Sequence, residues 1–151
     1  MTFLVISDFE CAMCREFNPI FDSIYSKYKA QVCFGYTNFG SYVTLSSMAA
    51  ESAAKQGKFW EMHDSLFSAS LLPDTTDLFR IASKINLNIE EFKKDLYDKN
   101  LATNIESNLF TLKNAGIYAT PTIMMNNKLI FNSSSIYEIE QKLLIELSSS
   151  N

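Results

Sequence analysis

The sequence predicts an α/β domain in which a β-α-β unit and a β-β-α unit enclose a block of helices. Two apolar, strand-like runs flank a stretch of helical periodicity near the N-terminus, and a hairpin pattern precedes a last helix near the C-terminus. Alanine-rich and amphipathic segments lie between them. A chain of 151 residues can bury a sizeable core without staples. We therefore expect a single domain over residues 1–151, with a helical insertion at about residues 44–115.

The first β-α-β unit occupies residues 3–36. Residues 3–9 form an apolar run without clean alternation, which is typical of a strand buried on both faces. From Cys11 to Tyr28, apolar residues recur at spacings of three and four, which predicts a helix with one buried stripe. Residues 32–36 form a second apolar run, and the helical crossover makes the two strands parallel.

Four or five helices are expected in the middle of the chain. Pro73 breaks the first helical stretch, and the Asp-Thr-Thr after it offers capping residues. Asn88 is the predicted cap of a later helix, and Gly116 ends the last one. The predicted helices lie within residues 44–69, 78–85, 89–97 and 102–114.

A β-hairpin and a last helix complete the pattern. Residues 122–125 and 129–131 are short apolar runs. Asn126 and Asn127 between them tolerate the positive φ angles of a tight turn. The last helix is expected to follow from Ser135.

Cys11-Ala-Met-Cys14 lies where the first strand leads into the first helix. Cys11 is therefore expected at the helix N-terminus, where unpaired N–H groups and the helix dipole stabilise a thiolate. Because the thiolate is the attacking species, Cys11 is the candidate nucleophile, and Cys14, one turn deeper, is the candidate resolving cysteine. Their redox-active disulfide would do the chemistry, so that no dissociable cofactor is needed.

Two other interpretations of the cysteines are possible. A zinc site would need Cys33 and His63 to complete its ligands, and neither lies in a recognisable pair, so we expect no metal. An inert, structural disulfide between Cys11 and Cys14 stays open. Cys33, in an apolar strand, is expected to be a buried inert thiol. His63 is expected to be a packing or surface residue and not a catalytic base.

Charge and hydropathy exclude several classes of function. The net charge is −4 and the lysines are scattered, so nucleic acid is not an expected partner. No run of about 18 apolar residues exists to span a bilayer, and the N-terminus lacks the regions of a secretory signal. Because residues 3–9 already resemble a core strand, the chain starts abruptly, as it would if a signal or anchor had been trimmed.

Three segments resemble the DsbA-like branch of the thioredoxin superfamily in their order and spacing. They are Asp8-Phe-Glu-Cys-Ala-Met-Cys-Arg-Glu-Phe17, Gln56-Gly-Lys-Phe-Trp-Glu-Met-His-Asp-Ser-Leu-Phe67 and Gly116-Ile-Tyr-Ala-Thr-Pro-Thr122. Pro19, five residues after Cys14, lies where thioredoxin-like proteins commonly kink this helix. The resemblance implies a thioredoxin fold with a mixed central sheet and an inserted helical domain. It also implies a protein dithiol-disulfide oxidoreductase.

Thr120-Pro121 begins the predicted hairpin, where proline can carry a cis peptide bond at little cost. The resemblance implies that Pro121 is cis beside the cysteine pair. It also implies that Thr120 binds the backbone of a substrate peptide and helps to set the reactivity of the pair. The implied partners are substrate polypeptides with thiols or disulfides and a redox recycling protein, either a quinone-linked membrane oxidase or a reducing thioredoxin-like donor. The implied location is exported and periplasmic, with a cytoplasmic one left open.

Two departures from the family pattern leave the direction of electron flow open. Strongly oxidising members have a histidine directly before the second cysteine, where this chain has Met13, which brings neither charge nor a strong donor. We therefore expect Cys11 to be less acidic and the domain less oxidising. Some members have a buried acid six residues before the first cysteine, where this chain has Val5. Proton transfer to Cys14 then needs another group, such as Glu10 or water.

Three enzymatic activities and one non-catalytic role therefore stay open. Within the enzyme class the chain could be an oxidase, a reductase or an isomerase. From another class, a thioredoxin-fold module could bind peptides while its cysteine pair stays locked. Met13, Phe9 and Tyr118 are candidates for an apolar rim that contacts substrate, and the alternative is that all three pack inside the domain.

Overall fold

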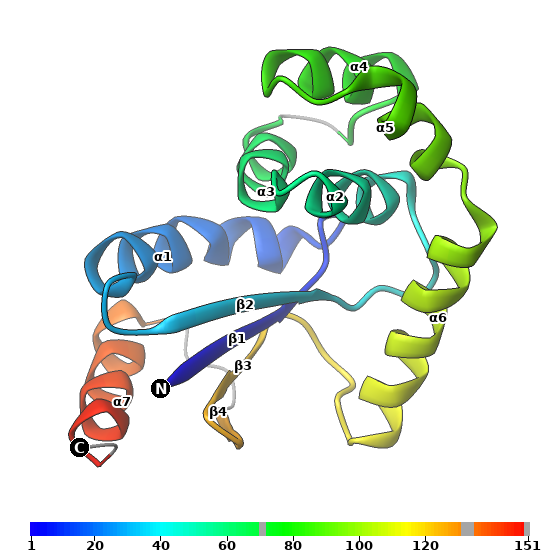
Figure 1. Cartoon of the computed structure of the whole chain (residues 1–151). Helices are drawn as coiled ribbons and strands as arrows, with labels where there is room; N and C mark the ends of the chain where they lie inside the picture. Colours follow the sequence, from blue (N-terminus) through cyan, green and yellow to red (C-terminus); the bar gives the residue numbers. More distant parts are fainter. Residues whose placement is uncertain (70–71, 131–134, 150–151) are drawn as a thin grey trace. The chain divides into compact units, whose positions relative to one another are not determined.

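The computed structural model describes residues 1–69, 72–130 and 135–149 (Figure 1). The chain divides into two compact units. One consists of Met1–Phe39 together with Ile117–Asn151 and holds the sheet. The other, Gly40–Gly116, is helical where the structure assigns regular elements, and it is the insertion that the sequence predicts at about residues 44–115.

The sheet has four strands in the order β2-β1-β3-β4. Their bounds are Thr2–Ser7 (β1), Cys33–Asn38 (β2), Thr122–Met125 (β3) and Lys128–Ile130 (β4). β1 pairs in parallel with β2 and antiparallel with β3, and β3 pairs antiparallel with β4. The predicted mixed sheet is therefore confirmed, and β1 lies at its centre.

Helix α1, Ala12–Tyr28, packs on one face of the strands β1 and β2. The ring of Phe21 lies 6.4 Å from that of Phe3 and 5.9 Å from that of Phe34, measured between ring centroids. The buried positions of α1 recur every three or four residues, as the apolar stripe predicts. Pro19 lies inside this helix.

Helix α7, Ile136–Ser148, is tied to α1 and to the hairpin by polar contacts. The Tyr28 hydroxyl donates a hydrogen bond to the Glu140 carboxylate at 2.6 Å, and Lys27 forms an ion pair with the same carboxylate. At the other end, the buried Glu146 accepts hydrogen bonds from Asn126 at 3.0 Å and from Lys128 at 2.6 Å. These contacts hold α7 against α1 at one end and against the β3–β4 hairpin at the other.

The predicted hairpin is present, and its turn uses Asn126 with a φ of +52°. Asn126 also exchanges hydrogen bonds with Thr2, because its backbone N–H donates to the Thr2 carbonyl at 2.8 Å and its side-chain oxygen accepts from the Thr2 N–H at 3.1 Å. The predicted second strand reaches Phe131, which lies outside the described residues.

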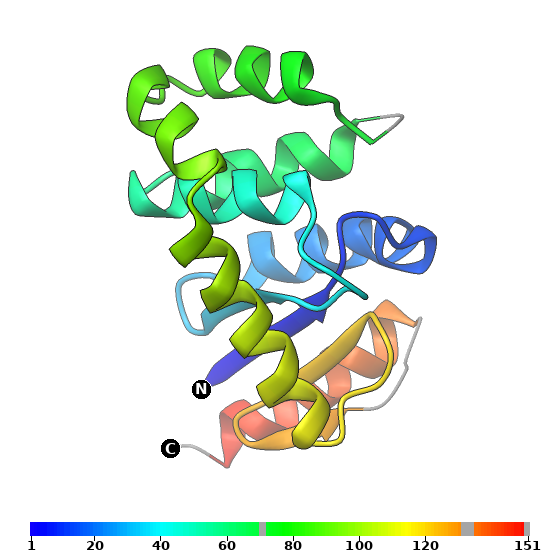
Figure 2. The same cartoon turned by 90° about the vertical axis from the view of Figure 1, so that its right-hand side faces the viewer.

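The helical unit contains α2 (Leu45–Lys55), α3 (Phe59–Ser68), α4 (Thr75–Lys84), α5 (Ile89–Leu96) and α6 (Lys99–Asn114). Helix α2 packs against each of the other four (Figure 2). Asn88 caps α5 as predicted, since its side chain accepts from the N–H groups of Glu90 and Glu91. Gly116, with a φ of +83°, adopts the left-handed conformation that commonly follows a helix end.

Two helices begin earlier than the apolar period predicts. α4 begins at Thr75 because Asp74 and Asp77 form a capping box at its N-terminus. α6 begins at Lys99 because the Asp98 side chain accepts a hydrogen bond from the N–H of Asn100. In both cases polar capping residues extend the helix beyond its apolar stripe.

The prediction that Cys33 is buried is wrong, because its thiol is exposed. Cys33 is the first residue of β2, which lies at one edge of the sheet, and alternation points its side chain away from the face that carries Phe34. His63 is fully buried in α3, with the rings of Trp60 and Phe67 at 5.2 and 4.9 Å, so it is a packing residue as expected.

Two further features of the described residues bear on function. No helix among them combines the length and the apolar character needed to cross a membrane. Within the same residues, no three His, Cys, Asp or Glu side chains gather in a way that could hold a metal ion.

The N-cap of α5 gives a test of the helical unit. We expect Asn88→Ala to lower the free energy of unfolding by about 1 kcal/mol, because the N–H groups of Glu90 and Glu91 lose their acceptor. Urea denaturation followed by circular dichroism measures this change. The matched control is Asn104→Ala, an exposed position inside α6, which should be neutral or slightly stabilising. Equal effects of the two substitutions would contradict the capping role.

Candidate active site

Cys11 and Cys14 lie at the N-terminus of α1, directly after the loop that leaves β1. Cys11 is the N-cap residue, with extended backbone angles, and Cys14 is in the first turn. The loop is fixed by Asp8, whose carbonyl accepts from the Cys11 N–H at 3.2 Å and whose carboxylate accepts from the Glu10 N–H at 2.9 Å. Cys11 is partly exposed, whereas Cys14 is buried.

The pairing of β3 with β1 brings Thr120 and Pro121 to the same place. Ile6 and Thr122 are partners in the antiparallel register, so the residues just before β3 lie beside those just after β1. The Thr120–Pro121 peptide bond is cis. The Cys11 Sγ lies 3.9 Å from the carbonyl oxygen of Thr120, to which its thiol can donate. Residues 109 positions apart in the chain thus form one site.

The surroundings of Cys11 favour its thiolate. Partial burial raises the pKa of Cys11, but hydrogen bonds from the Thr120 side chain, from Cys14 and from the Met13 backbone outweigh it, so the pKa lies below the ordinary thiol value. Donors of this kind stabilise negative charge on sulfur. Cys11 is therefore the better nucleophile of the pair and also the better leaving group.

Cys14 has the opposite tendency. Burial raises its pKa to about 11, although hydrogen bonds from the Ser7 and Thr120 side chains and from the Asp8 backbone lower it in part. The Asp8 N–H lies 3.4 Å from the Cys14 Sγ. At neutral pH Cys14 is therefore a thiol, and it has to lose its proton before it can attack.

The three candidates for an apolar rim differ in their exposure. Met13 and Tyr118 are 56% and 79% exposed and are free to contact a substrate chain. Phe9 is buried, and its ring stacks on that of Tyr36 at 5.2 Å, so for this residue the alternative of packing inside the domain holds. Val5 is buried in β1, and its side chain is apolar.

Two features of the site were not predicted from the sequence. Ser7 is buried at the end of β1, and its hydroxyl is one of the groups that lower the pKa of Cys14. The side chain of Thr120, for which the resemblance implies a role in reactivity, favours the thiolate of Cys14 as well as that of Cys11. A polar residue at the end of an apolar strand, four positions before Cys11, was the available signal for Ser7.

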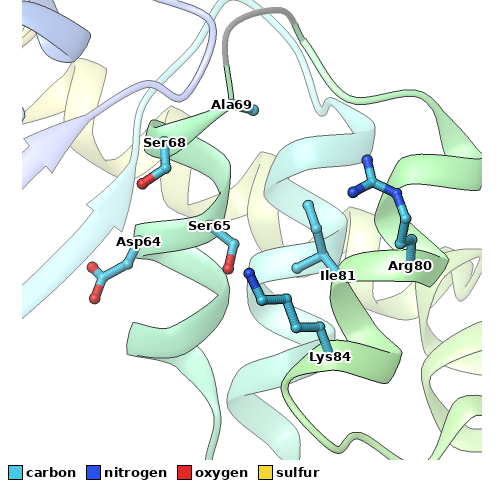
Figure 3. A pocket seen from close by; sticks show the side chains of 7 residues that line it. All are labelled: Asp64, Ser65, Ser68, Ala69, Arg80, Ile81 and Lys84. Atoms are coloured by element: carbon cyan, nitrogen blue, oxygen red, sulfur yellow. The ribbon is translucent and has the colours of Figure 1, made fainter.

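A separate pocket of about 320 Å³ lies in the helical unit, between α3 and α4 (Figure 3). Figure 3 shows Lys84 and Ser65 facing one another across it, while the carboxylate of Asp64 points away from α4. Arg80, which also lines it, is held in an ion pair with Asp77. Its lining residues include no cysteine, so this pocket is not the site of thiol chemistry.

A family model described as Thioredoxin matches residues 1–144 of the chain. The chain is also 30% identical over 165 residues to disulfide bond formation protein D of Bacillus subtilis (strain 168), a match that covers 97% of this chain and 72% of that protein. The crystal structure of oxidised BdbD from Bacillus subtilis superposes with a TM-score of 0.83 at 27% identity, covering 97% of this chain and 87% of that one. The thioredoxin fold is thereby confirmed.

A second group of relatives consists of much longer proteins. Over 133 residues the chain is 29% identical to the Na(+)/H(+) antiporter NhaA 3 of Salinispora tropica, which covers 85% of this chain and 20% of the antiporter. The chain thus spans about a fifth of the length of such antiporters.

The opposite tendencies of the two thiols give a prediction for alkylation. In the reduced protein, iodoacetamide should modify Cys11 at a lower pH than Cys14, which should react only as the pH approaches about 11. Thr120→Val removes a donor that lowers the pKa of Cys11, so the alkylation profile of Cys11 should move to higher pH. Mass mapping of each cysteine separates these signals from that of the exposed Cys33.

The control for this experiment is Thr2→Val, an exposed position at the far end of β1, which should leave the profile of Cys11 unchanged. If Thr120→Val also leaves it unchanged, the side chain of Thr120 does not act on the nucleophile.

Proposed function

Because the chain belongs to the thioredoxin family, in its DsbA-like branch, we propose that it exchanges disulfides with protein substrates through Cys11 and Cys14. The observation that supports this most is the contrast between the two thiols. Cys11 is partly exposed with a lowered pKa, and Cys14 is buried with a raised one. A purely structural pair needs no such contrast.

The exchange runs through a mixed disulfide. When the domain donates its disulfide, a substrate thiolate attacks the Cys11 Sγ, the bond between Cys11 and Cys14 breaks, and Cys14 leaves with the electron pair and takes up a proton. A second substrate thiolate then attacks the substrate sulfur of the mixed disulfide. Cys11 leaves as the thiolate, which its hydrogen bonds stabilise. Two electrons have passed from the substrate to the cysteine pair.

Substrate binding is assigned to the residues around Cys11. Thr120 and the cis Pro121 lie directly beside the nucleophile, where their backbone can align an extended peptide. Met13, more than half exposed, adds an apolar contact next to the reacting sulfur. This arrangement recognises the backbone of a chain more than its sequence, which suits varied protein substrates.

The name of the Bacillus subtilis relative supports the direction of disulfide formation. A reductase or isomerase is the second candidate, because Met13 takes the place of a histidine that could donate to the Cys11 thiolate. Both directions use the same residues and the same mixed disulfide. They differ only in which state of the pair is more stable.

Turnover requires a partner that restores the cysteine pair. For disulfide formation, this partner is an oxidant such as a membrane oxidase, and for reduction it is a dithiol donor. We assign the domain to an exported, oxidising compartment, because protein disulfides form and persist there.

Trapping of the mixed disulfide tests the proposed function. In a Cys33→Ser background, Cys14→Ser should accumulate a disulfide between Cys11 and a denatured protein substrate that carries cysteines, because the resolving thiol is missing. Cys11→Ser, the matched control, should accumulate none, since Cys14 is buried. Non-reducing gel electrophoresis reads both results. If neither variant forms the adduct, the domain is a binding module with an inert pair.

A further inference from the structure

Ser7 and Asn38 are the last residues of the neighbouring strands β1 and β2. They are partners in the parallel register, so their side chains point to the same face of the sheet. That face also carries Phe3 and Phe34, whose rings pack with Phe21 of α1. Ser7 and Asn38 therefore lie on the α1 side of the sheet, at the end where α1 begins.

The carboxamide of Asn38 is buried without a hydrogen-bond partner among the described residues. Only 6% of the residue is exposed. Neither its Oδ1 nor its Nδ2 atom has a hydrogen-bond partner among the residues that the structure describes. Buried polar side chains are nearly always bonded, either to protein or to an ordered water molecule. An unpaired amide at this place therefore indicates a bound polar molecule as small as water.

Ser7, the register partner of Asn38, acts on the resolving cysteine. Ser7 is only 2% exposed, and its hydroxyl is one of the groups that lower the pKa of Cys14. The backbone N–H of Asp8, the next residue, lies 3.4 Å from the same sulfur. The Ser7 hydroxyl and the Asp8 N–H are thus two polar groups that act on Cys14. Asn38 lies beside Ser7 in the neighbouring strand β2.

Cys14 needs such a connection, because the described residues offer no buried acid beside it. Val5, which faces the same side of the sheet as Ser7, is buried and apolar. The carboxylate of Asp8 accepts from the Glu10 backbone within the loop. Among the groups that lower the pKa of Cys14 are the Ser7 hydroxyl and the Asp8 backbone, and not the Asp8 carboxylate.

We propose that Ser7 and Asn38 hold a water molecule that carries protons to and from the Cys14 Sγ during disulfide exchange. Ser7 is then a catalytic residue, because its hydroxyl acts on the Cys14 Sγ, and Asn38 is a positioning residue for the water. The inference rests on the proposed function and adds a proton path to it. Of the two proton carriers expected from the sequence, Glu10 and water, this path uses the water.

The proton path is balanced in both directions. When Cys14 resolves a mixed disulfide, its Sγ gives its proton to the water, which passes a proton on to solvent, and the resulting thiolate attacks the Cys11 Sγ. The bond between Cys11 and Cys14 forms, the bond between Cys11 and the substrate sulfur breaks, and that sulfur leaves with the electron pair and takes a proton from solvent. In the reverse reaction Cys14 leaves as the thiolate, and the water returns a proton to it.

Resolution can be measured apart from the first attack. In a Cys33→Ser background, the reduced protein is mixed with an aromatic disulfide that releases a coloured thiolate. Attack by Cys11 releases one equivalent, and attack by Cys14 on the resulting mixed disulfide releases the second. Stopped-flow absorbance gives both rates in one trace.

Asn38→Leu, which has a similar shape but no polar group, should slow the second release about tenfold or more, toward the lower end of what proton transfer contributes. The first release should be unchanged. Asn38→Asp, which keeps a polar side chain of the same size, should restore the second rate. Ser7→Ala should slow the second release as well, and it serves as the test if Asn38→Leu does not fold.

The inference is overturned if these apolar variants resolve at the unsubstituted rate, or if Asn38→Leu and Asn38→Asp slow both releases equally, as a structural role would predict. The proposed function fails separately, when Cys14→Ser traps no protein substrate. Suppose that Asn38→Leu releases the second thiolate at the normal rate while Cys14→Ser still traps a protein substrate. The proposed proton path would then be wrong, and the proposed exchange reaction would stand.

Discussion

The pairing of β1 with strands on both of its sides is the constraint on which the site depends. Its parallel partner β2 follows α1 in the chain, and its antiparallel partner β3 follows the whole helical unit. All three strands carry site residues at the same end of the sheet. Cys11 follows β1, Asn38 ends β2, and Thr120 precedes β3. A shift of register in either pair would separate the two sulfur atoms from the residues that act on them.

The two cysteines differ because one helical turn separates an exposed position from a buried one. Cys11, as the N-cap residue, meets donors that lower its pKa, and Cys14 enters the protein interior, where burial raises its pKa. Because only two residues separate the cysteines, the same helix start holds Cys11 as a thiolate that can attack and Cys14 as a protonated thiol. As a consequence, Cys14 has to lose its proton before it attacks. We assign that proton transfer to the polar groups of Ser7 and Asn38 at the ends of β1 and β2.

The local parts of the site could be predicted from the sequence, and the parts that depend on strand register could not. The position of Cys11 at a helix start follows from a strand-to-helix change in periodicity. Ser7 and Asn38 were missed because they meet only through the pairing of two strands. Cys33 was wrongly predicted to be buried, since an apolar run does not show that its strand lies at a sheet edge. Whether Phe9 belonged to the rim or to the interior stayed open, because its partner Tyr36 lies in β2, which is distant in the sequence.

The equilibrium of the Cys11 and Cys14 pair in glutathione buffers, read by thiol trapping, tests the central claim most directly. The account predicts a reversible pair with a potential between about −270 and −120 mV, the range from thioredoxin to the most oxidising members. A value near the upper end indicates disulfide donation, and one near the lower end indicates reduction. A pair that stays oxidised below about −300 mV and does not exchange with glutathione would contradict the account, since that is the behaviour of a structural disulfide.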